Sequence, residues 1–593
     1  MSSTYTAATI GPIYKTLNIA RKTRELWGAS YLISYIMRRL IEEIGKPEKL
    51  CLPYHEKLLD IWKGKGVGLF PDRLFFEGDI IDQIKDAESV ILNEIHISSN
   101  LPLDYLKNYF HIHTLNYTLP QEISNSEDNV KRNNENNNII FVGNTLLDTI
   151  ELKEKHYLHD INNIEWKKGI DKINGNRFYK ESFTKWNDKQ FEFPSIVEIA
   201  TDDFRKENKV EYYKLVDIHL KHQEENDQNN FLNALKNATK FDITTPPNEA
   251  AKEDGKSQKK KVFGPISFRP YHKYIAVVQA DGDNIGTTIA KIGDDPSTIR
   301  FFSSALFDFA IAAHEKIKNY GGKAVYIGGD DLLFFAPVAI HSEGENGPML
   351  KSIFGLLGEI DSVFEQTIIK NPNLNSLYHT DEELKNPDEF TDKIIKPSMS
   401  YGVSITYSKY PLNEARDTAY HLMLKAKEKK WDKNKICFKL HKHSGQGFGF
   451  TIDKKLNKAQ QQPESFKYFM KMVNNIPLQE GFLSSVIYKL APLHQLLIAI
   501  AAEKQRVIDF FDQEFELEKL KVKRTNSGLS DRNERSKLNF LENVVEYFYH
   551  LAIEFPNDNK DIPAMETEQP DSNIAKLYST LRFMKHLTDE TDD

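Results

Sequence analysis

The stretch Tyr-Ile-Gly-Gly-Asp-Asp-Leu-Leu-Phe-Phe, from Tyr326 to Phe335, decides the fold because it reads as a tight turn between two strands. Residues 323–327 and 332–336 are apolar and rich in residue types that favour strands, and Gly328-Gly329-Asp330-Asp331 supplies the turn. The sequence therefore predicts a β-hairpin that carries two carboxylates at its tip.

A second acidic element lies upstream of the hairpin. Val277 to Gly286 reads Val-Val-Gln-Ala-Asp-Gly-Asp-Asn-Ile-Gly, the end of a buried strand over 273–280 followed by Asp281 and then Asp283. If this strand and the hairpin share one sheet, their carboxylates gather at one edge, which is costly unless cations neutralise them. Carboxylate oxygens suit Mg²⁺ or Mn²⁺, and two such ions are what the transfer of a nucleotide from a triphosphate requires.

The order of the surrounding elements supports this meeting of acids. Residues 303–320 and 413–430 have helical spacing, and 435–440 reads as a last strand. The order is then strand, helix, hairpin, helix, strand, with 398–407 as an added strand, which is close to a ferredoxin-like split βαβ arrangement. A right-handed crossover makes the first two strands parallel, so Asp281 meets the tip of the hairpin in space.

Glycines and backbone amides near these acids predict a nucleotide site. Gly328 and Gly329 allow positive φ and a close approach of a nucleotide to the backbone, and Asp-Gly-Asp-Asn-Ile-Gly offers successive N–H groups to phosphate. The predicted nucleotide-binding residues here are Gly282, Asp283, Asn284, Ile285, Gly286, Gly328 and Gly329. The alternative is that Gly-Gly-Asp-Asp is ordinary hairpin chemistry whose acids face water.

With these motifs quoted, residues 274–445 resemble the palm domain shared by nucleotidyl cyclases, GGDEF enzymes and template-dependent polymerases. The Gly-Gly-Asp-Asp form resembles that of the large polymerase/cyclase subunit of type III CRISPR effector complexes, in the III-B (Cmr) branch. Other stretches are similar to this family: 20–30 (Ala-Arg-Lys-Thr-Arg-Glu-Leu-Trp-Gly-Ala-Ser), 193–196 (Phe-Pro-Ser-Ile) and a series from Pro411 to Gly445. The resemblance implies an α+β chain with two ferredoxin-like palm domains, a helical insert and a C-terminal helical bundle.

The resemblance also implies roles for individual residues. Asp281, Asp330 and Asp331 would hold two Mg²⁺ or Mn²⁺ ions, and Lys427 resembles the family's phosphate-binding lysine. Ser30 and Ser195 would line the acceptor side. The substrate would be ATP, and the product either a cyclic oligoadenylate or AMP conjugated to S-adenosylmethionine.

Asp72 starts a β-type run, Asp72-Arg73-Leu74-Phe75, in the first predicted palm. If the two palms pair face to face, as in the family, Asp72 points toward the acceptor side of the nucleotide cleft. The alternative is that Asp72 caps a turn or pairs with Arg73, and the sequence leaves both open.

The resemblance further implies that the partners are other Cmr-type subunits, a guide crRNA and a target RNA. Many relatives carry an N-terminal HD nuclease domain. The chain begins directly with the first palm, so we expect no DNase activity and interpret His159-Asp160 as ordinary surface residues.

The length and composition of the chain limit the number of its domains and the kinds of site and partner that it can have. The chain has 593 residues, too many for one core, and we predict four units: palm 1–150, helical connector 151–261, GGDD palm 262–450 and helical domain 451–593. Two cysteines exclude a disulfide scaffold and a Cys₄ zinc site, and fit a reducing cytoplasm. The apolar stretch 496–502 is too short to span a membrane, so no membrane contact is expected. The net charge of −8 restricts any RNA contact to a local patch.

Two other classes of protein fit parts of this pattern. One is a free-standing GGDEF-like cyclase that makes a dinucleotide as a symmetric dimer, which is disfavoured because the chain carries two predicted palms. The other is a non-catalytic scaffold of an RNA-guided complex, which has no physical need for a destabilising acidic cluster. We also interpret Asp202-Asp203 as acids of a solvated loop.

Overall fold

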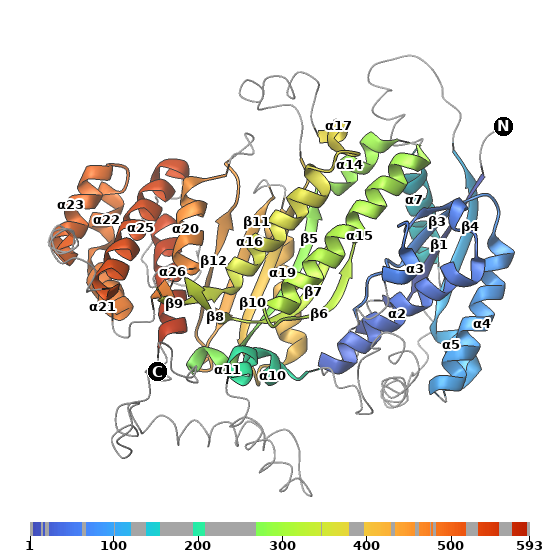
Figure 1. The fold of residues 1–593 in the computed structure, drawn as a ribbon, viewed down its shortest axis with the longest axis horizontal. Coiled ribbons are helices and arrows are strands. Elements are labelled where there is room, and N and C mark those ends of the chain that lie inside the picture. The colour runs from blue at the N-terminus through green and yellow to red at the C-terminus, as the bar shows by residue number, and fades with distance from the viewer. Residues whose placement is uncertain are drawn as a thin grey trace, which may run out of the picture.

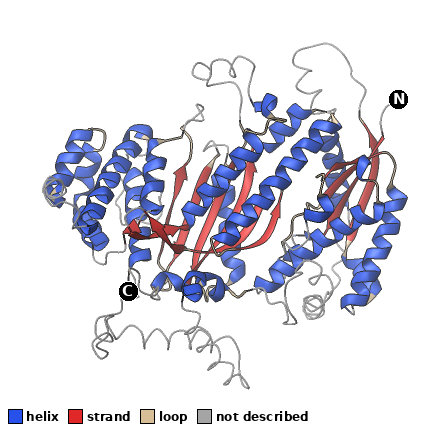
Figure 2. Cartoon of the chain, in the orientation of Figure 1, coloured by secondary structure: helices blue, strands red, loops and turns tan. Residues whose placement is uncertain are grey.

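The computed structural model describes residues 4–13, 16–17, 20, 23–61, 67–99, 101–119, 138–153, 194–207, 269–293, 295–344, 347–378, 396–428, 433–456, 462–474, 476–477, 482–517, 532–556 and 572–589. Within these residues the chain is a mixed α+β protein with two large sheets and one small sheet (Figures 1 and 2). The predicted fold class is confirmed. Most of the predicted connector 151–261 and the dipeptide His159-Asp160 lie outside the described residues.

The N-terminal sheet has four strands in the order β2-β3-β1-β4. The strands are β1 (Thr4–Gly11), β2 (Leu50–Leu52), β3 (Arg73–Glu77) and β4 (His111–Thr118), and β1 pairs antiparallel with both β3 and β4. The helices of this part are α2 (Thr23–Ile44), α3 (Leu58–Ile61), α4 (Ile81–Ser99), α5 (Leu103–Tyr109) and α7 (Ile139–Lys153), with a short 3₁₀ turn at Pro47–Lys49.

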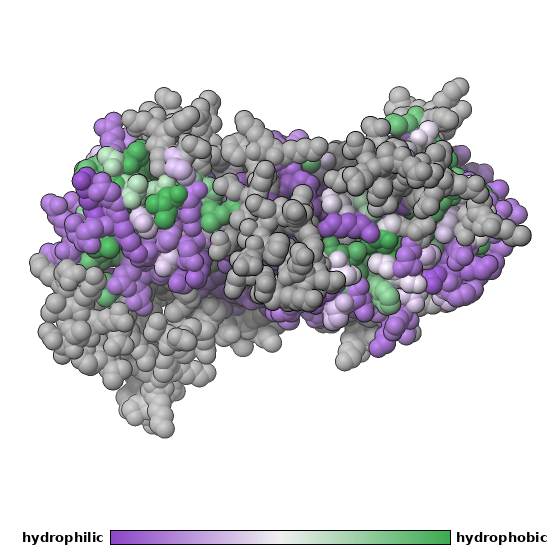
Figure 3. Space-filling view, turned by 90° about the horizontal axis from the view of Figure 1, so that it is seen from above, coloured by the Kyte–Doolittle hydropathy of each residue, from purple (hydrophilic) through white to green (hydrophobic). Residues whose placement is uncertain are grey.

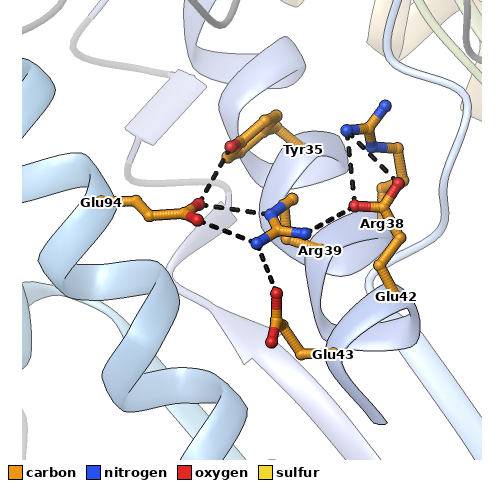
Figure 4. A network of polar contacts seen from close by, with 6 residues as sticks. All are labelled: Tyr35, Arg38, Arg39, Glu42, Glu43 and Glu94. Carbon is orange, nitrogen blue, oxygen red and sulfur yellow. Dashed lines mark hydrogen bonds and ion pairs between the residues drawn. The ribbon is translucent and has the colours of Figure 1, made fainter. Parts of the chain in front are cut away.

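An ion-pair network holds α2 against α4 (Figure 4). The guanidinium of Arg39 donates to both carboxylate oxygens of Glu94, at 2.8 and 3.2 Å, and to Glu42 on its own helix at 2.7 Å. The hydroxyl of Tyr35 donates to Glu94 as well, at 3.2 Å. Because Glu94 is multiply bonded, this contact fixes the two helices more firmly than one exposed ion pair would.

The central sheet has six strands in the order β12-β11-β10-β5-β7-β6. They are β5 (Tyr274–Asp283), β6 (Lys323–Gly328), β7 (Asp331–Pro337), β10 (Ser398–Tyr407), β11 (Lys435–His441) and β12 (Gly447–Asp453). Its helices are α14 (Ile285–Ile292), α15 (Pro296–Asn319), α16 (Ile353–Phe364), α17 (Asn375–Tyr378) and α19 (Leu412–Ala426), with a 3₁₀ turn η2 at Pro270–Lys273 and a π-helical turn at Glu365–Ile369.

Helices cover both faces of the central sheet. Tyr401 donates from its hydroxyl to Asp361 on α16, whereas at Gly402 an added Cβ would lie 2.0 Å from the carbonyl oxygen of Ala419 on α19. Successive strand residues point to opposite faces, so α16 and α19 lie on opposite sides of β10. Figure 1 shows α15 and α16 crossing the face of the sheet that is nearer the viewer.

The prediction that 398–407 is an added strand is wrong. This segment is β10, which pairs antiparallel with β5 over its whole length, and the helix that precedes it is α16, which the sequence analysis missed. The added strand is β11, which pairs parallel with β10. The ferredoxin-like core is therefore β5-α15-β6-β7-α16-β10, with α19 and β11 as an extension.

The remaining elements are a small sheet, β13-β9-β8, and the C-terminal helices. They comprise β8 (Ala339–Gly344), β9 (Gly347–Ser352), β13 (Ile476–Pro477), α20 (Glu464–Asn474), α21 (Phe482–Leu490), α22 (His494–Ile500), α23 (Lys504–Phe515), α25 (Arg532–Glu554) and α26 (Asn573–Thr588). One stretch, Phe482–Ile500, is long and apolar enough to cross a membrane by length and composition alone, which is weak support for a span. A 3₁₀ turn with Pro492 divides it into α21 and α22, both of which contact α26. Figure 3 shows small apolar patches among polar surface at this end of the molecule.

The two large sheets are joined at an edge strand. Gly68 forms an isolated parallel bridge with Tyr326 of β6, and the N–H of Ile327 donates to the carbonyl of Gly68 at 2.8 Å. Arg300 on α15 donates from Nε to the carbonyl of Leu50 on β2 at 2.9 Å. The N-terminal sheet is therefore fixed beside the hairpin that carries the predicted acids.

Candidate active site

The end of β5 and the β6–β7 turn bring three predicted acids together. A Cβ added at Gly282 would lie 2.5 Å from Oδ2 of Asp330, so Asp330 rests directly on the backbone beside Asp281. Burial, and then the charge of Asp281, raise the pKa of Asp330 to about 7. The same two causes, with Asp330 next, raise the pKa of Asp331 to about 8. The structure thus places these carboxylates in the costly arrangement that the sequence predicted.

The donor set fits a divalent cation shared with a phosphate ligand. Oδ1 of Asp331 is buried and has no hydrogen-bond partner among the described residues. Among all the residues that the structure describes, no three His, Cys, Asp or Glu side chains are close enough to enclose a metal ion by themselves. Mg²⁺ is commonly held by one or two carboxylates together with substrate phosphates, so this open cluster fits an ion that a phosphate would help to hold.

Lys427, which resembles the family's phosphate-binding lysine, lies beside the acids. It is the C-cap residue of α19, and its Nζ lies 2.5 Å from Oδ2 of Asp281 and donates to the carbonyl of Gly282 at 2.9 Å. The ammonium group also lowers the pKa of both Asp330 and Asp331 in part. One cation therefore already offsets some of the negative charge.

The carboxylate of Asp283 has a structural role. It is fully buried, and its Oδ2 accepts from the hydroxyls of Ser398 at 2.8 Å and Ser400 at 2.7 Å and from the N–H of Asn434 at 2.9 Å. These bonds anchor the loop after β5 to β10 and to the residues before β11. Oδ1 of Asp283 is buried and has no hydrogen-bond partner among the described residues, so only one of its two oxygens takes part in this anchor.

Left-handed backbone conformations gather around this loop. Of the four described non-glycine residues with positive φ, three lie here: Asn284 at 60°, Lys433 at 51° and Asn434 at 53°. Nζ of Lys433 donates to Oδ1 of Asn284 at 3.3 Å. Such residues store strain and cluster at functional sites. The sequence analysis missed Lys433, although its place in a short polar loop just before a strand was a signal.

Two of the predicted glycines are required by neighbouring side chains. A Cβ at Gly282 would collide with Asp330, as described above, and a Cβ at Gly328 would lie 1.7 Å from the hydroxyl oxygen of Tyr326. Gly329 has φ of 70° and is required by the turn itself. Gly286 and Ile285 open α14, with Gly286 exposed.

The predicted acceptor residues divide into two groups. Asp72 is close enough to Asp331 and Tyr326 for its charge to raise the pKa of both, and burial raises the pKa of Asp72 itself. Ser30 is buried at Gly68, where an added Cβ would lie 2.6 Å from its Oγ and 3.4 Å from Tyr326. Arg73 contacts Asp148 and Asn144 on α7, so its strongest contacts are with that helix. Asp72, Ser30 and Tyr326 thus lie together next to the acids.

Ser195 lies elsewhere. It is the N-cap of α10 (Ile196–Ala200), in a capping box with Glu198, and α10 contacts η2 at the start of β5. Asp281 lies near the other end of this strand, roughly 20 Å away along its axis. The structure does not bring Ser195 to the acids.

Asp203 is not a solvated acid, and that prediction is wrong. It lies on α11 (Asp202–Glu207) and is 8% exposed. Its Oδ1 is 3.0 Å from Nε2 of His272, and its Oδ2 is 2.9 Å from Nδ1 of His341. These two histidines hold the pKa of Asp203 well below its usual range despite burial. The cluster fastens α11 to the start of β5 and to β8.

Comparisons with known proteins agree with this architecture. Residues 274–437 match the family model for the second palm domain of Cas10/Cmr2, and residues 5–93 match that for the N-terminal part of the CRISPR-associated protein Cmr2. No curated protein matches the sequence.

Among solved structures, the chain is similar to one of a type III-B Cmr-beta complex in its apo state, at 13% identity over 98% of this chain and 81% of that chain, with a TM-score of 0.48. It is also similar to one of a Csm1–Csm4 cassette in complex with pppApA, at 9% identity over 99% of this chain and 70% of that chain, with a TM-score of 0.45.

Proposed function

From the premise that the chain belongs to the Cas10/Cmr2 family of CRISPR-associated proteins, we propose that it is a nucleotidyltransferase that uses ATP and two divalent metal ions to make a nucleotide second messenger for antiviral defence. The observation that carries the proposal is the cluster of Asp281, Asp330 and Asp331, in which the pKa values of Asp330 and Asp331 are raised, a buried oxygen of Asp331 has no partner among the described residues and Lys427 lies beside the acids. A purely structural role gives no reason to concentrate carboxylates that only one lysine partly compensates.

The side chains divide the work of the reaction. Asp281, Asp330 and Asp331 would hold Mg²⁺ or Mn²⁺, which when bound would supply Lewis-acid activation of the acceptor hydroxyl and charge neutralisation on the leaving group. Lys427 would place its ammonium group on the β- and γ-phosphates, and the N–H groups from Gly282 to Gly286 would donate to phosphate oxygens. The acceptor oxygen would form a bond to the α-phosphorus while the bond to the β-phosphate oxygen breaks and pyrophosphate leaves.

The acceptor defines the product. A 3′-hydroxyl of a second ATP would lead to a cyclic oligoadenylate, whereas S-adenosylmethionine as acceptor would lead to an AMP conjugate. Asp72 supports the AMP conjugate as a candidate product, because a carboxylate beside Asp331 and Tyr326 suits an acceptor that carries positive charge.

We place this activity in an RNA-guided complex. The proposed partners are other Cmr-type subunits, a guide crRNA and a target RNA whose binding starts synthesis, and the proposed location is the cytoplasm. We expect neither DNase activity nor a bound zinc ion.

The test is to incubate the assembled complex with target RNA, Mg²⁺ or Mn²⁺ and α-labelled ATP, with and without S-adenosylmethionine, and to identify products by mass spectrometry. Cyclic oligoadenylate in both reactions, or a conjugate only with S-adenosylmethionine, supports the proposal and names the product. An Asp330→Ala/Asp331→Ala variant is the control. Equal absence of product from wild type and variant would leave a non-catalytic scaffold.

An Asp72→Asn variant tests the acceptor side in the same reactions. We expect the ratio of conjugate to oligoadenylate to fall about tenfold, because the variant loses one charge interaction near the acceptor. An unchanged ratio would remove Asp72 from acceptor selection without affecting the assignment of the catalytic acids.

A further inference from the structure

One fully buried amide side chain links the two large sheets next to residues 282–286, which are called the nucleotide loop below. Asn138 immediately precedes α7, and its Oδ1 accepts from the N–H groups of Ile140 at 2.9 Å and Phe141 at 3.2 Å. Its Nδ2 donates to the carbonyls of Ile289 at 2.7 Å and Gly293 at 2.8 Å. One side chain therefore caps the N-terminus of α7 and the C-terminus of α14 at the same time.

The α7 end of this link is rigid. Helix α7 contacts β1 and β4, and the hydroxyl of Tyr117 on β4 donates to the carbonyl of Ile139 at 2.7 Å. A Cβ at Gly143 would lie 2.5 Å from the ring of Phe75 on β3, so the helix backbone lies directly on the N-terminal sheet. Arg73 binds the side chain of Asn144 at 2.8 Å. Any shift of α14 relative to Asn138 is thus a shift relative to the whole N-terminal sheet.

The α14 end of the link leads to the catalytic acids. Helix α14 spans Ile285–Ile292 and follows the end of β5, which holds Asp281 and Asp283, after Asn284 alone. Cγ1 of Ile285 lies against Gly282, 2.7 Å from an added Cβ, and the ring of Phe141 on α7 lies 3.9 Å from an added Cβ at Gly286. Of the amides proposed to bind phosphate, those of Ile285 and Gly286 therefore lie in the first turn of a short helix whose other end is held by Asn138.

From this geometry we infer that Asn138 is a positioning residue for ATP, supplied by the N-terminal palm to the nucleotide loop of the GGDD palm. The inference rests on the proposed function, because it assigns the amides of residues 282–286 to the triphosphate. Asn138 acts through α14 and does not touch the nucleotide. Its four hydrogen bonds hold the phosphate-binding amides at a fixed distance from Asp330, and a misplacement of about 1 Å in such a site can cost about a hundredfold in rate.

Asn138→Ser separates the two caps. Serine is also a good N-cap and keeps an acceptor for α7, but it has no amide donors and does not reach α14. Asn138→Asp is the second variant, since it keeps the cap of α7 and turns an acceptor toward two carbonyl oxygens. The matched control is Ser572→Ala, which removes the N-cap of α26 in the C-terminal bundle.

Two measurements on the full chain in its complex test the inference. In the nucleotide-free protein, Asn138→Ser should increase hydrogen exchange of amides in 285–293, while Ser572→Ala should leave them unchanged. With Mg²⁺ and a non-hydrolysable ATP analogue, Asn138→Ser should raise the dissociation constant about tenfold, and KM for ATP should rise more than kcat falls. Asn138→Asp should show both effects more strongly.

The outcomes separate this inference from the proposed function. If the wild type binds no ATP analogue, the proposed function fails and takes the inference with it. If the wild type binds the analogue and Asn138→Ser binds it equally, Asn138 does not position the nucleotide, whatever its effect on hydrogen exchange. A weaker affinity that Ser572→Ala reproduces would also overturn the inference, because it would reflect general stability.

Discussion

The Nζ atom of Lys427 lies 2.5 Å from Oδ2 of Asp281, so a predicted phosphate ligand and a predicted metal ligand form an ion pair in the free protein. Both groups are partly exposed, at 21% and 32% of their side chains. Binding of ATP with a metal ion would exchange this pair for two new ones, lysine with phosphate and carboxylate with metal. In the free protein the pair therefore holds both groups in place and partly neutralises them.

Lys427→Gln should weaken ATP binding and destabilise the metal-free protein. We expect KM for ATP to rise about tenfold or more, because a charge-assisted contact to phosphate is lost. The metal-free protein should lose about 1 kcal/mol, since Asp281 and Asp330 lose their nearest cation but remain partly solvated. Steady-state kinetics and urea unfolding in a chelator measure the two effects. Lys439→Gln, an exposed lysine on β11, is the control and should change neither. A Lys427→Gln enzyme with the wild-type KM would remove the lysine from the phosphate site.

Metal binding should strengthen with pH up to about 8. The pKa of Asp330 is raised to about 7 and that of Asp331 to about 8, so in the metal-free protein both carboxyls hold protons below these values. A divalent ion must displace those protons, and its affinity should rise up to about tenfold per pH unit for each proton released. Titration calorimetry with Mn²⁺ in two buffers of different ionisation enthalpy measures the release. Asp330→Asn/Asp331→Asn should abolish it, and Mn²⁺ affinity that is flat between pH 6 and 8 in the wild type would contradict this assignment.

The protons on Asp330 and Asp331 also determine whether the stability of the metal-free protein rises or falls with pH. The folded protein binds them more tightly than the unfolded chain does, because the pKa values are raised. Their contribution to stability is therefore complete below the unfolded pKa, about 4, and is lost as pH rises through the folded values. In a chelator, Asp330→Asn/Asp331→Asn should gain stability relative to the wild type across this range, which unfolding at a series of pH values would show.

Gly328→Ala tests the contact with Tyr326. The added methyl group would overlap the tyrosine hydroxyl, so the ring must move, and we expect a cost of about 1–3 kcal/mol. In a Tyr326→Ala background the same change should cost much less, because the overlap is gone. Gly329→Ala is the control: its cost arises from a φ of 70° and should be the same in both backgrounds. Equal costs for Gly328→Ala in both backgrounds would refute the packing explanation.

Asp203→Asn should destabilise the protein by about 3–5 kcal/mol at neutral pH, because it breaks a buried contact with His272 and His341. The pKa of Asp203 is lowered in the folded state, so its contribution is present above the unfolded pKa of about 4 and is lost as pH falls toward the folded value. The stability difference between wild type and variant should therefore shrink below about pH 4. Asp308→Asn, which breaks the exposed pair with His55, should cost at most about 1 kcal/mol. A difference that stays constant with pH would mean that Asp203 acts without its charge.

Local sequence signals were enough to predict the hairpin and the strand that leads to Asp281. The apolar run, the two glycines and the paired acids are adjacent in the chain, and the right-handed crossover then places Asp281 against Asp330. Lys427 was found through a resemblance, and the structure places it at hydrogen-bonding distance from Asp281.

The misses have physical causes. Helix α16 is buried at most positions, so it lacks the polar face whose spacing reveals a helix. Because this helix was missed, residues 398–407 were assigned to an added strand and not to the strand that pairs with β5. Asp203 shows nothing locally, because its partners His272 and His341 lie far away in the chain. The cap that Asn138 provides for α7 is local, but its bonds to Ile289 and Gly293 are distant in the chain. The packing of Tyr326 over Gly328 is a property of side-chain direction at the end of β6, which spacing alone does not give.

The bridge between Gly68 and Tyr326 joins two sheets that belong to one chain. Their pairing is therefore intramolecular, and its effective concentration is set by the connection between them and not by the amount of protein in the cell. A cyclase assembled from two single-palm chains falls apart on dilution, and its output then drops with the square of its concentration. This chain carries both sheets at any dilution, so the proposed site does not depend on the encounter of two copies of the chain.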